Sequence, residues 1–386
     1  MPRQKPFLRN SYDYFLLAKF PAVKHELNSE IHISGNNAEG LSSFLKEKNY
    51  SAHFILTDDN THKHCLPVFT DNFRGRAFDP EAAGIIKIYA GEQHKNIQAV
   101  EYVWKRLSEA NADRNSVLIN LGGGMVCDLG GFAAATYKRG IDFIHVPTSL
   151  LAMCDAAIGG KQGIDFLHFK NQVGVFQSPQ RVFINDIFLQ TLPQEQLVSG
   201  FAEVVKHAFI AGGKLRKSIM EIDDLREVKW KKIISGSIDL KLSVVDRDPF
   251  EKNFRKVLNF GHTIGHALES FLLDKKLSPL HGNCVAAGMI GELYLSCICC
   301  GLSDKKRYEA VTFIKRFFPK INFEEADIST IISLMKQDKK NRGGKIKMVL
   351  LGKFGKPMID QEVDEMLIEE ALKFIIKESG SNPEDS

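Results

Sequence analysis

The chain has 386 residues, of which 44% are hydrophobic and 25% are charged, so it can bury a large core and form two domains. The formal net charge of +4 is too small to argue for nucleic acid as a partner, and no uninterrupted apolar run reaches the length of a membrane span. Basic residues therefore matter as local clusters, which suit a small anionic ligand.

The seven cysteines indicate reduced thiols rather than disulfides. Their number is odd, and Cys297, Cys299 and Cys300 lie in an apolar helical run without a pairing framework. Buried thiols of this kind are typical of a reducing compartment, so we expect a cytoplasmic protein. The N-terminus is basic but lacks an apolar signal core, and residues 378–386 are predicted to form a disordered tail.

The first half alternates short β-rich runs with helical patterns. The runs cover residues 53–57, 84–89, 116–121, 142–146 and 181–184, and a helical pattern covers residues 96–112. This alternation predicts an α/β domain whose parallel sheet is covered by helices on both faces.

The second half is predicted to be mostly helical. From Pro193, which suits the first turn of a helix, helical patterns continue to about residue 377, and residues 345–351 are the main β-rich run among them. We place the boundary near residues 187–192, which divides the chain into domains 1–190 and 191–377.

A glycine turn follows the strand predicted at residues 116–121. Gly122-Gly-Gly124 precedes a helical pattern over residues 125–137, where backbone N–H groups could meet a pyrophosphate. A tight strand-to-helix turn without a ligand explains three glycines equally well. Asp58, at the end of an earlier strand, suits either a hydrogen bond to a ribose or an Asx turn that ends the strand.

Several cations lie close to these turns. Lys161, within Gly159-Gly-Lys-Gln-Gly163, and Lys170 are predicted on loops beside backbone donors, which suits phosphate or carboxylate binding. A solvated surface lysine is the ordinary alternative for each one alone. Taken with Lys206, Lys241 and Arg255, they favour an anion site.

One carboxylate and three imidazoles suggest an open divalent-metal site. Glu203 and Lys206 are three positions apart and His262 and His266 are four apart, so each pair shares one face of a predicted helix. A surface ion pair and a structural histidine pair are the alternatives. His281 precedes a run of small residues that permits close helix packing. Three protein ligands with a vacant position suit catalytic zinc.

These segments resemble the 3-dehydroquinate synthase family of sugar-phosphate cyclases over about residues 50–355. The resemblance rests on several motifs in order: residues 122–140, Val146-Pro-Thr-Ser-Leu-Leu-Ala-Met-Cys-Asp155, Gly159-Gly-Lys161, Lys170-Asn171, Thr191-Leu-Pro193, Gly200-Phe-Ala-Glu-Val-Val-Lys206, Leu258-Asn-Phe-Gly-His-Thr-Ile-Gly-His266 and Asp338-Lys-Lys340.

The resemblance implies an NAD- and metal-dependent lyase of the shikimate pathway. Such an enzyme converts 3-deoxy-D-arabino-heptulosonate 7-phosphate into 3-dehydroquinate and phosphate. It implies a Rossmann-like nucleotide-binding domain followed by a mostly α-helical metal- and substrate-binding domain. It also implies a homodimer. The ligand would be a small phosphorylated sugar acid, with neither nucleic acid nor membrane involved.

The resemblance also assigns residues. The metal ligands, for Zn²⁺ or alternatively Co²⁺, would be Glu203, His262 and His281. NAD would meet Asp58, Asn60, Glu92, Lys95, Gly123, Gly124, Asp128, Thr148, Ser149, Lys161 and Lys170. The substrate would meet Arg139 of the second subunit, Asp155, Lys161, Lys170, Asn171, Lys206, Lys241, Arg255, Asn259, His266 and Lys339. The catalytic set would be His266, which carries protons, with Lys206, Asp155, Lys161 and the supporting carboxylate of Glu251.

Three positions depart from the family pattern. Asp165 stands where the family usually has Asn, Phe169 where it has Gly, and Asn283 where it has an acid. These departures bear on loop geometry and substrate preference. The alternatives are a cyclase acting on sedoheptulose 7-phosphate, a metal-dependent alcohol or glycerol dehydrogenase of related fold, and a non-catalytic binding or scaffold protein.

Overall fold

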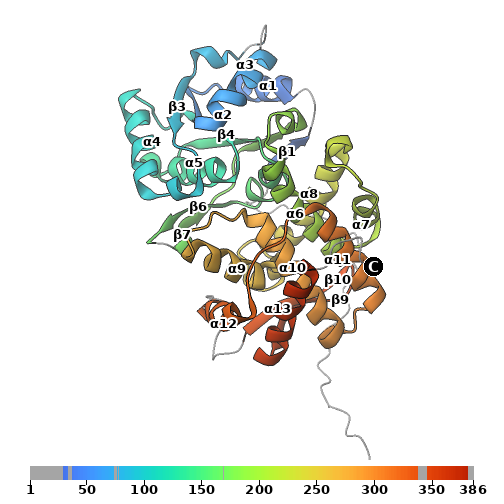
Figure 1. Ribbon diagram of the computed structural model, residues 1–386. Coiled ribbons are helices and arrows are strands. Elements are labelled where there is room, and N and C mark those ends of the chain that lie inside the picture. The colour runs from blue at the N-terminus through green and yellow to red at the C-terminus, as the bar shows by residue number, and fades with distance from the viewer. Residues whose placement is uncertain are drawn as a thin grey trace, which may run out of the picture.

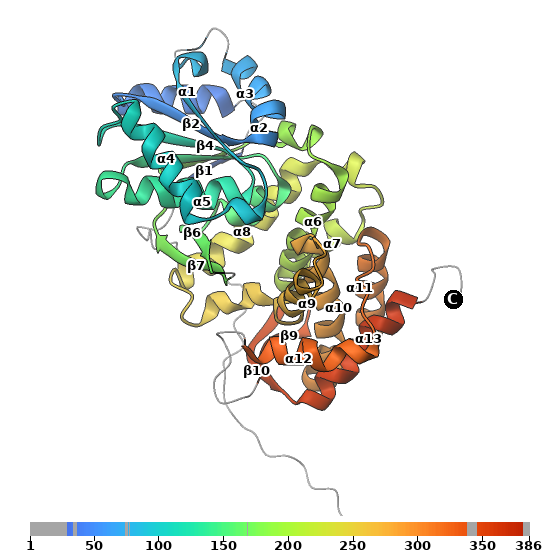
Figure 2. The ribbon, with the colours of Figure 1, turned by 60° about the vertical axis from the view of Figure 1, so that its left-hand side comes forward.

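The computed structural model describes residues 29–33, 37–73, 76, 78–167, 169–337 and 346–380. The chain forms a sheet-containing half followed by a helical half, and the β6–β7 hairpin lies between them (Figures 1 and 2). This arrangement confirms the predicted fold class.

A six-stranded parallel sheet organises the first half. Its order is β1-β8-β5-β4-β2-β3, and every pairing in it is parallel. The strands are β1 (Glu30–Ile33), β2 (His53–Asp58), β3 (Gly84–Ile88), β4 (Val117–Gly122), β5 (Asp142–Pro147) and β8 (Arg181–Ile184). The chain runs outward from β2 to β3 and then crosses back to β4. The carboxyl ends of β2 and β4 therefore flank a topological switch point, where such sheets bind ligands.

Helices cover both faces of the sheet. They are α1 (Asn37–Lys48), α2 (Asp59–His64), α3 (Leu66–Phe73), α4 (Ile97–Glu109) and α5 (Gly124–Thr136). Leu118 packs in one apolar core with residues of α4 and α5, whereas its neighbours Val117 and Ile119 pack on the opposite face with residues of α1 and α3. Since both faces are buried, β4 is apolar throughout rather than alternating.

The helical half contains α6 (Gln194–Ala211), α7 (Gly213–Met220), α8 (Trp230–Arg247), α9 (His262–Asp274), α10 (His281–Cys300), α11 (Asp304–Phe317), α12 (Ile328–Gln337) and α13 (Glu365–Gly380), with the antiparallel pair β9 (Ile346–Lys353) and β10 (Lys356–Val363). Helix α10 is long and apolar enough to cross a membrane, but 67% of its apolar stretch is buried in the protein. It contacts α6, α9 and α13 and forms the centre of this half.

The prediction that Lys161 and Lys170 lie on glycine-rich loops is wrong. These lysines lie on β6 (Lys161–Phe166) and β7 (Phe169–Phe176), which pair as an antiparallel hairpin. Gly163 and Gly174 face each other, and a Cβ on Gly174 would lie 2.4 Å from the carbonyl oxygen of Gln162. The glycines therefore permit close strand contact rather than a loop, and two rigid strands hold the lysines.

The ends of the expected domains differ in detail from the elements. Between β8 and α6 lies the 3-10 helix η5 (Asp186–Gln190), so the proposed boundary near residues 187–192 falls within and just after this short element. Helix α13 extends to Gly380, three residues into the segment expected to be a tail. Residues 381–386 of that segment lie outside the described residues.

His145 on β5 is fully buried in a polar network. Its Nδ1 lies 3.2 Å from the Asn120 side-chain nitrogen and its Nε2 lies 3.4 Å from that of Gln162. Burial lowers the pKa of this imidazole to about 3, with Gln162 opposing the shift. Below about pH 6.5, the ordinary histidine pKa, only the unfolded chain takes up this proton, so the folded state loses stability as the pH falls towards 3.

We therefore expect the free energy of unfolding to fall by about 1.4 kcal/mol between about pH 7.5 and about pH 5.5 because of His145 alone. Urea unfolding at both pH values measures this loss. His145→Gln should remove the contribution, whereas His64→Gln, on the exposed face of α2, should leave it. An unchanged pH dependence in His145→Gln would contradict the assignment.

Candidate active site

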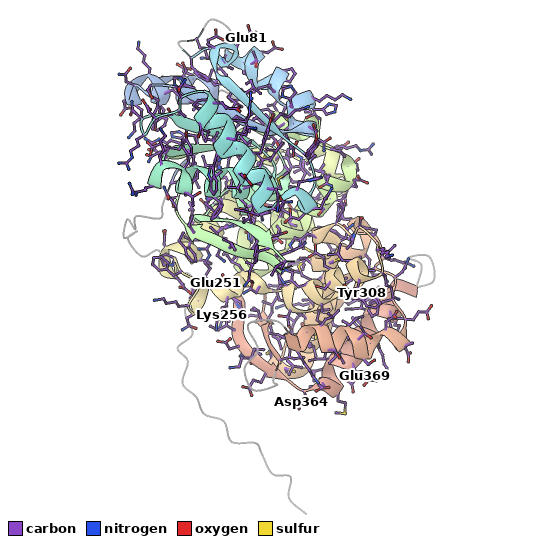
Figure 3. All side chains as sticks on the ribbon, turned by 90° about the vertical axis from the view of Figure 1, so that its left-hand side faces the viewer. Glu81, Glu251, Lys256, Tyr308, Asp364 and Glu369 are labelled. Atoms are coloured by element: carbon purple, nitrogen blue, oxygen red, sulfur yellow. The ribbon has the colours of Figure 1, made fainter. Side chains whose placement is uncertain are left out.

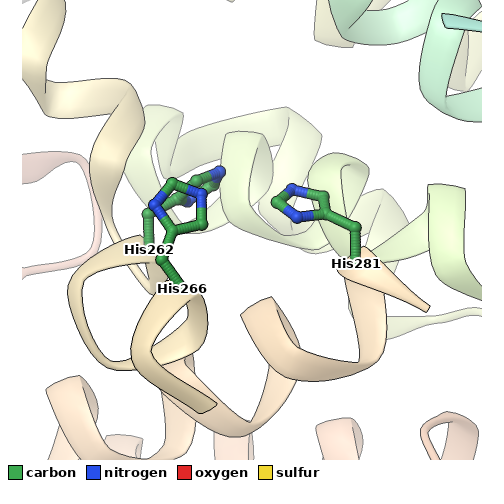
Figure 4. A group of neighbouring side chains, drawn as sticks. All are labelled: His262, His266 and His281. Atoms are coloured by element: carbon green, nitrogen blue, oxygen red, sulfur yellow. The ribbon is translucent and has the colours of Figure 1, made fainter. Parts of the chain in front are cut away.

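Three histidine rings converge where α9 meets α10. His262 is the first residue of α9, His266 lies one turn further along it, and His281 is the first residue of α10. Their ring centroids lie 5.1 to 5.7 Å apart, and Figure 4 shows the rings facing a common space. The i,i+4 spacing on α9 therefore does place both imidazoles on one side of that helix.

Glu203 from α6 completes the cluster. Its Oε1 lies 3.4 Å from Nε2 of His262 and 3.6 Å from Nε2 of His281. The other ring nitrogen of each histidine faces outward: Nδ1 of His262 lies 3.2 Å from the carbonyl oxygen of Phe260, and Nδ1 of His281 lies 3.3 Å from Oε2 of Glu269. If each Nδ1–H donates to its outer acceptor, both Nε2 lone pairs point towards Glu203.

The cluster is electrostatically suited to a cation. Glu203 is only 1% exposed, and its carboxylate lies against the Lys206 ammonium and the Nε2 atoms of His262 and His281. Burial raises the pKa of this carboxyl, but the Lys206 ammonium and His262 lower it well below its usual range. Burial lowers the pKa of His281, but Glu203 and Glu269 raise it to about 9. A divalent cation would replace the proton on His281.

Three sets of three ligands are geometrically available for a metal. One is Glu203 with His262 and His281; the others are the three histidines and the group of Asp155, Glu203 and His207, each with ligand atoms within 4.8 Å of one another. The orientation of His262 and His281 favours the first set, because their Nε2 atoms face a buried carboxylate.

Glycines let the supporting helices approach closely. A Cβ on Gly282 of α10 would lie 1.8 Å from the carbonyl oxygen of Ser199 on α6, and one on Gly288 would lie 2.0 Å from that of Gly261. Gly261 itself is left-handed (φ 81°) and donates its N–H to the buried carboxylate of Glu292 at 2.6 Å. Glu292 thus fixes the start of α9, where His262 stands.

Four lysines of the predicted anion site are each paired with a carboxylate. Lys206 contacts Glu203 and Lys161 contacts Glu251; the distances are 2.7 Å for both Lys170 with Glu269 and Lys241 with Asp155. In each of the last three pairs, one residue comes from the first half of the chain and the other from the second. The pairs neutralise a cationic site until an anion competes for the lysines.

Arg255 and Asn259 are two further residues of the predicted substrate site, and both are held by hydrogen bonds. The buried Arg255 guanidinium donates to the carbonyl oxygens of Gly159 (3.2 Å) and Pro249 (2.8 Å). Asn259 lies 3.4 Å from the carboxylate of Glu251, which lies close to the junction of the two halves (Figure 3). Glu251 thereby contacts both Lys161 and Asn259.

Asp155 lies on a π-helical turn, Ala152–Ala156. Such turns are rare and frequent at functional sites. Burial raises the pKa of Asp155, but Lys241 and Lys206 lower it below its usual range. The fully buried His207 lies 3.8 Å from Asp155 and 2.6 Å from the hydroxyl of Ser237. Burial and Lys206 lower the pKa of His207 to about 3, so this ring is neutral.

The glycine turn after β4 offers room for a pyrophosphate. Gly123 caps the N-terminus of α5 without a side chain, and a Cβ there would lie 3.4 Å from Oγ of Ser149. Thr148 donates its N–H to the carbonyl oxygen of Gly122 at 2.9 Å, which places residues 148–149 beside the turn. The backbone amides at the start of α5 are thus accessible to an anion, which fits a dinucleotide.

A buried cation lies next to this turn. Lys95 is 3% exposed, and its ammonium lies 2.6 Å from both Asp128 and Asn171 and 3.7 Å from Glu92. Burial lowers the pKa of Lys95, but the carboxylates of Asp128 and Glu92 outweigh burial and raise this pKa above its usual value. These contacts bring together four of the residues assigned to cofactor or substrate.

Asp58 caps the start of α2. Its Oδ1 accepts from the backbone N–H and the hydroxyl of Thr61, at 2.7 and 2.9 Å, in a capping box rather than an Asx turn. Oδ2 takes no part in this box. Asn60, two residues on, is exposed.

Arg139 is not brought to this site. It is exposed on left-handed backbone (φ 70°) at the end of the 3-10 helix η3 (Tyr137–Arg139), and none of the contacts among the described residues ties it to this cluster. Lys339 lies outside the described residues.

The departures from the family pattern have modest structural effects. Asp165 accepts the N–H of the left-handed Asn171 at 2.7 Å, which an asparagine oxygen could also do. Asn283 donates its N–H to the carbonyl oxygen of Leu280 at 3.0 Å. Phe169 begins β7.

Sequence reasoning missed Glu269, Glu292 and His207. Glu269 follows His262 and His266 at an i+7 and i+3 spacing, so helical periodicity alone could have found it. Glu292 and His207 carry no such signal, because their partners come from other elements.

Two family models match consecutive parts of the chain. One, described as 3-dehydroquinate synthase N-terminal, covers residues 85–199, and the other, described as 3-dehydroquinate synthase C-terminal, covers residues 200–341. A 3-dehydroquinate synthase of Parabacteroides distasonis is 43% identical over 336 residues, which span 86% of this chain and 94% of that protein.

Solved structures share the fold. A 2-deoxy-scyllo-inosose synthase complexed with carbaglucose-6-phosphate, NAD+ and Co2+ has a TM-score of 0.78 at 24% identity, covering 89% of this chain and 96% of that one. ValA, a 2-epi-5-epi-valiolone synthase from Streptomyces hygroscopicus with NAD+ and Zn2+ bound, has a TM-score of 0.79 at 21% identity, covering 93% of this chain and 99% of that one.

Proposed function

The chain belongs to the 3-dehydroquinate synthase family, and from that premise we propose that it converts 3-deoxy-D-arabino-heptulosonate 7-phosphate into 3-dehydroquinate and phosphate. The observation that carries the proposal is the convergence of Glu203, His262 and His281 beside four paired lysines. A carboxylate and a phosphate on one substrate need several cations of this kind.

Glu203, His262 and His281 would hold a divalent metal, Zn²⁺ or Co²⁺. The metal would polarise neighbouring substrate hydroxyls and so favour loss of a proton from the one being oxidised. His266 faces the same space as the ligands. It would carry that proton away during oxidation and return one during reduction.

Gly123, Gly124, Thr148 and Ser149 at the glycine turn, with Asp58, Asn60, Glu92, Lys95 and Asp128, would hold NAD, which would supply reversible hydride transfer with no net oxidation. The start of α5, which no side chain caps, supports a pyrophosphate there.

The paired cations would receive the substrate anions. Lys161 and Lys170 come from the β6–β7 hairpin, and Lys206 and Lys241 from α6 and α8. An incoming anion would replace the carboxylates as their partner, while Arg255, Asn259 and Asn171 orient the ring. Before the anion binds, Asp155 and Glu251 would hold Lys241 and Lys161 in place. The protein contributes mainly orientation and electrostatics, which suit elimination, ring opening and aldol closure at the substrate itself.

The exposed Arg139 would act in trans. In a homodimer, its position outside this chain's own cluster would let it reach the neighbouring site. The substrate class, a small phosphorylated sugar acid, and a cytoplasmic location complete the proposal.

Substrate competition tests the function against its nearest alternatives. Purified protein is incubated with 3-deoxy-D-arabino-heptulosonate 7-phosphate and with sedoheptulose 7-phosphate, and the carbocyclic products are identified by mass spectrometry. We expect 3-dehydroquinate from the first and no cyclic product from the second. Turnover of sedoheptulose 7-phosphate alone would overturn the proposal, and steady accumulation of NADH would favour a dehydrogenase.

A further inference from the structure

We propose that Glu269 is a positioning residue that couples the metal cluster to the substrate-binding hairpin. It holds His281 with Nε2 directed at the metal position and simultaneously anchors Lys170. The inference deepens the proposed function and rests on it for the presence of a metal. Glu269 lies on α9, the helix that also carries His262 and His266, and its side chain is only 6% exposed.

The two carboxylate oxygens of Glu269 have different partners. Oε2 lies 3.3 Å from Nδ1 of His281, and Oε1 lies 2.7 Å from the ammonium of Lys170. A buried carboxylate is retained only when it is paired, and here both oxygens are used. Glu269 on α9 therefore bridges α10 and β7.

The contact with His281 fixes how that imidazole presents itself. Donation of Nδ1–H to Glu269 leaves the lone pair on Nε2, which lies 3.6 Å from Oε1 of Glu203. A carboxylate behind a histidine ligand also raises the basicity of the ligand nitrogen. His262 has only the backbone carbonyl of Phe260 behind it, at 3.2 Å. The two histidines are therefore supported unequally, and His281 depends on a removable side chain.

The contact with Lys170 ties the same carboxylate to the hairpin. Lys170 is 41% exposed and Glu269 is buried, so the ammonium can turn towards a bound anion while the carboxylate stays. The adjacent Asn171 accepts from Lys95 at 2.6 Å, which continues the chain of contacts to the nucleotide end. When a bound anion attracts the Lys170 ammonium, the Glu269 carboxylate loses that partner and keeps its contact with His281.

Metal affinity, measured without substrate, tests this inference. Zn²⁺ binding to the wild-type protein and to Glu269→Gln is measured by competition with a chromophoric chelator. We expect Glu269→Gln to bind Zn²⁺ about 10- to 100-fold more weakly, with both metal-free proteins folded at the temperature of the measurement. Asp274→Asn, an isosteric change at an exposed carboxylate on the same helix, is the matched control and should bind as wild type does.

A second variant separates positioning from loss of the ion pair. Lys170→Gln should raise the KM for the heptulosonate phosphate while Zn²⁺ affinity changes by less than about threefold, because His281 keeps its carboxylate. Zn²⁺ affinity of Glu269→Gln within twofold of wild type would overturn the inference while leaving the proposed function intact. Failure of the wild-type protein itself to bind Zn²⁺ would instead count against the proposed function.

Discussion

Replacing His262 by alanine is expected to remove the divalent metal from the protein and to lower kcat/KM by about 1,000-fold or more, which corresponds to about 4 kcal/mol of transition-state stabilisation. Nε2 of His262 lies 3.4 Å from Glu203, and its Nδ1 is tied to a backbone carbonyl. Alanine keeps the first turn of α9, whose N-terminus is fixed by Glu292 rather than by the imidazole. Metal content is measured after dialysis, together with steady-state kinetics.

His266→Ala is the informative comparison for this prediction. It removes a ring of the same chemistry from the same helix, one turn away. If His266 carries protons and is not a ligand, the variant keeps its metal while kcat falls by about 100- to 10,000-fold. Loss of metal from His266→Ala as well as from His262→Ala would favour the three-histidine alternative and contradict the ligand set with Glu203.

The second large effect is expected at Lys161. Lys161→Ala should lower kcat/KM by about 10- to 150-fold, because one charge-assisted contact to an anionic substrate contributes about 1.5–3 kcal/mol. Lys161 is half-exposed on β6 and paired with Glu251 rather than with a proposed metal ligand, so Zn²⁺ affinity should be unchanged. Kinetics and metal content are measured on the same preparation.

Lys63→Ala provides the control for Lys161. It removes an exposed lysine from α2, so it changes the net charge equally without touching the anion site. Unchanged kinetics in Lys161→Ala would remove that residue from the substrate and cofactor set. A similar loss in both variants would instead indicate a non-specific effect of charge.

The parallel sheet could be predicted because its strands are buried on both faces. β2, β4 and β5 are short apolar runs that end in turn residues, and their observed bounds differ from the predicted ones by one residue. The β6–β7 hairpin could not be predicted in the same way. Its glycines predicted a loop, whereas Gly163 and Gly174 allow the two strands to approach each other closely. Composition alone does not distinguish these two uses of glycine.

The site was predictable as far as local spacing reaches. The i,i+4 pair His262 and His266 and the i,i+3 pair Glu203 and Lys206 each share a helix face, as expected. Which carboxylate pairs with which lysine was not predictable, because the partners are 86 to 99 residues apart in sequence. Such pairs depend on how the two halves pack, so the pairing of Glu269 with Lys170 emerged only from that packing.

Phosphate release from 3-deoxy-D-arabino-heptulosonate 7-phosphate tests the central claim most directly. Purified protein with NAD is assayed for free phosphate and for absorbance of NADH, before and after treatment with a metal chelator. The account predicts stoichiometric release of phosphate without net NADH, its loss on chelation and its return when Zn²⁺ or Co²⁺ is added. Phosphate release that persists in full without metal, or no release in the presence of metal and NAD, would contradict it.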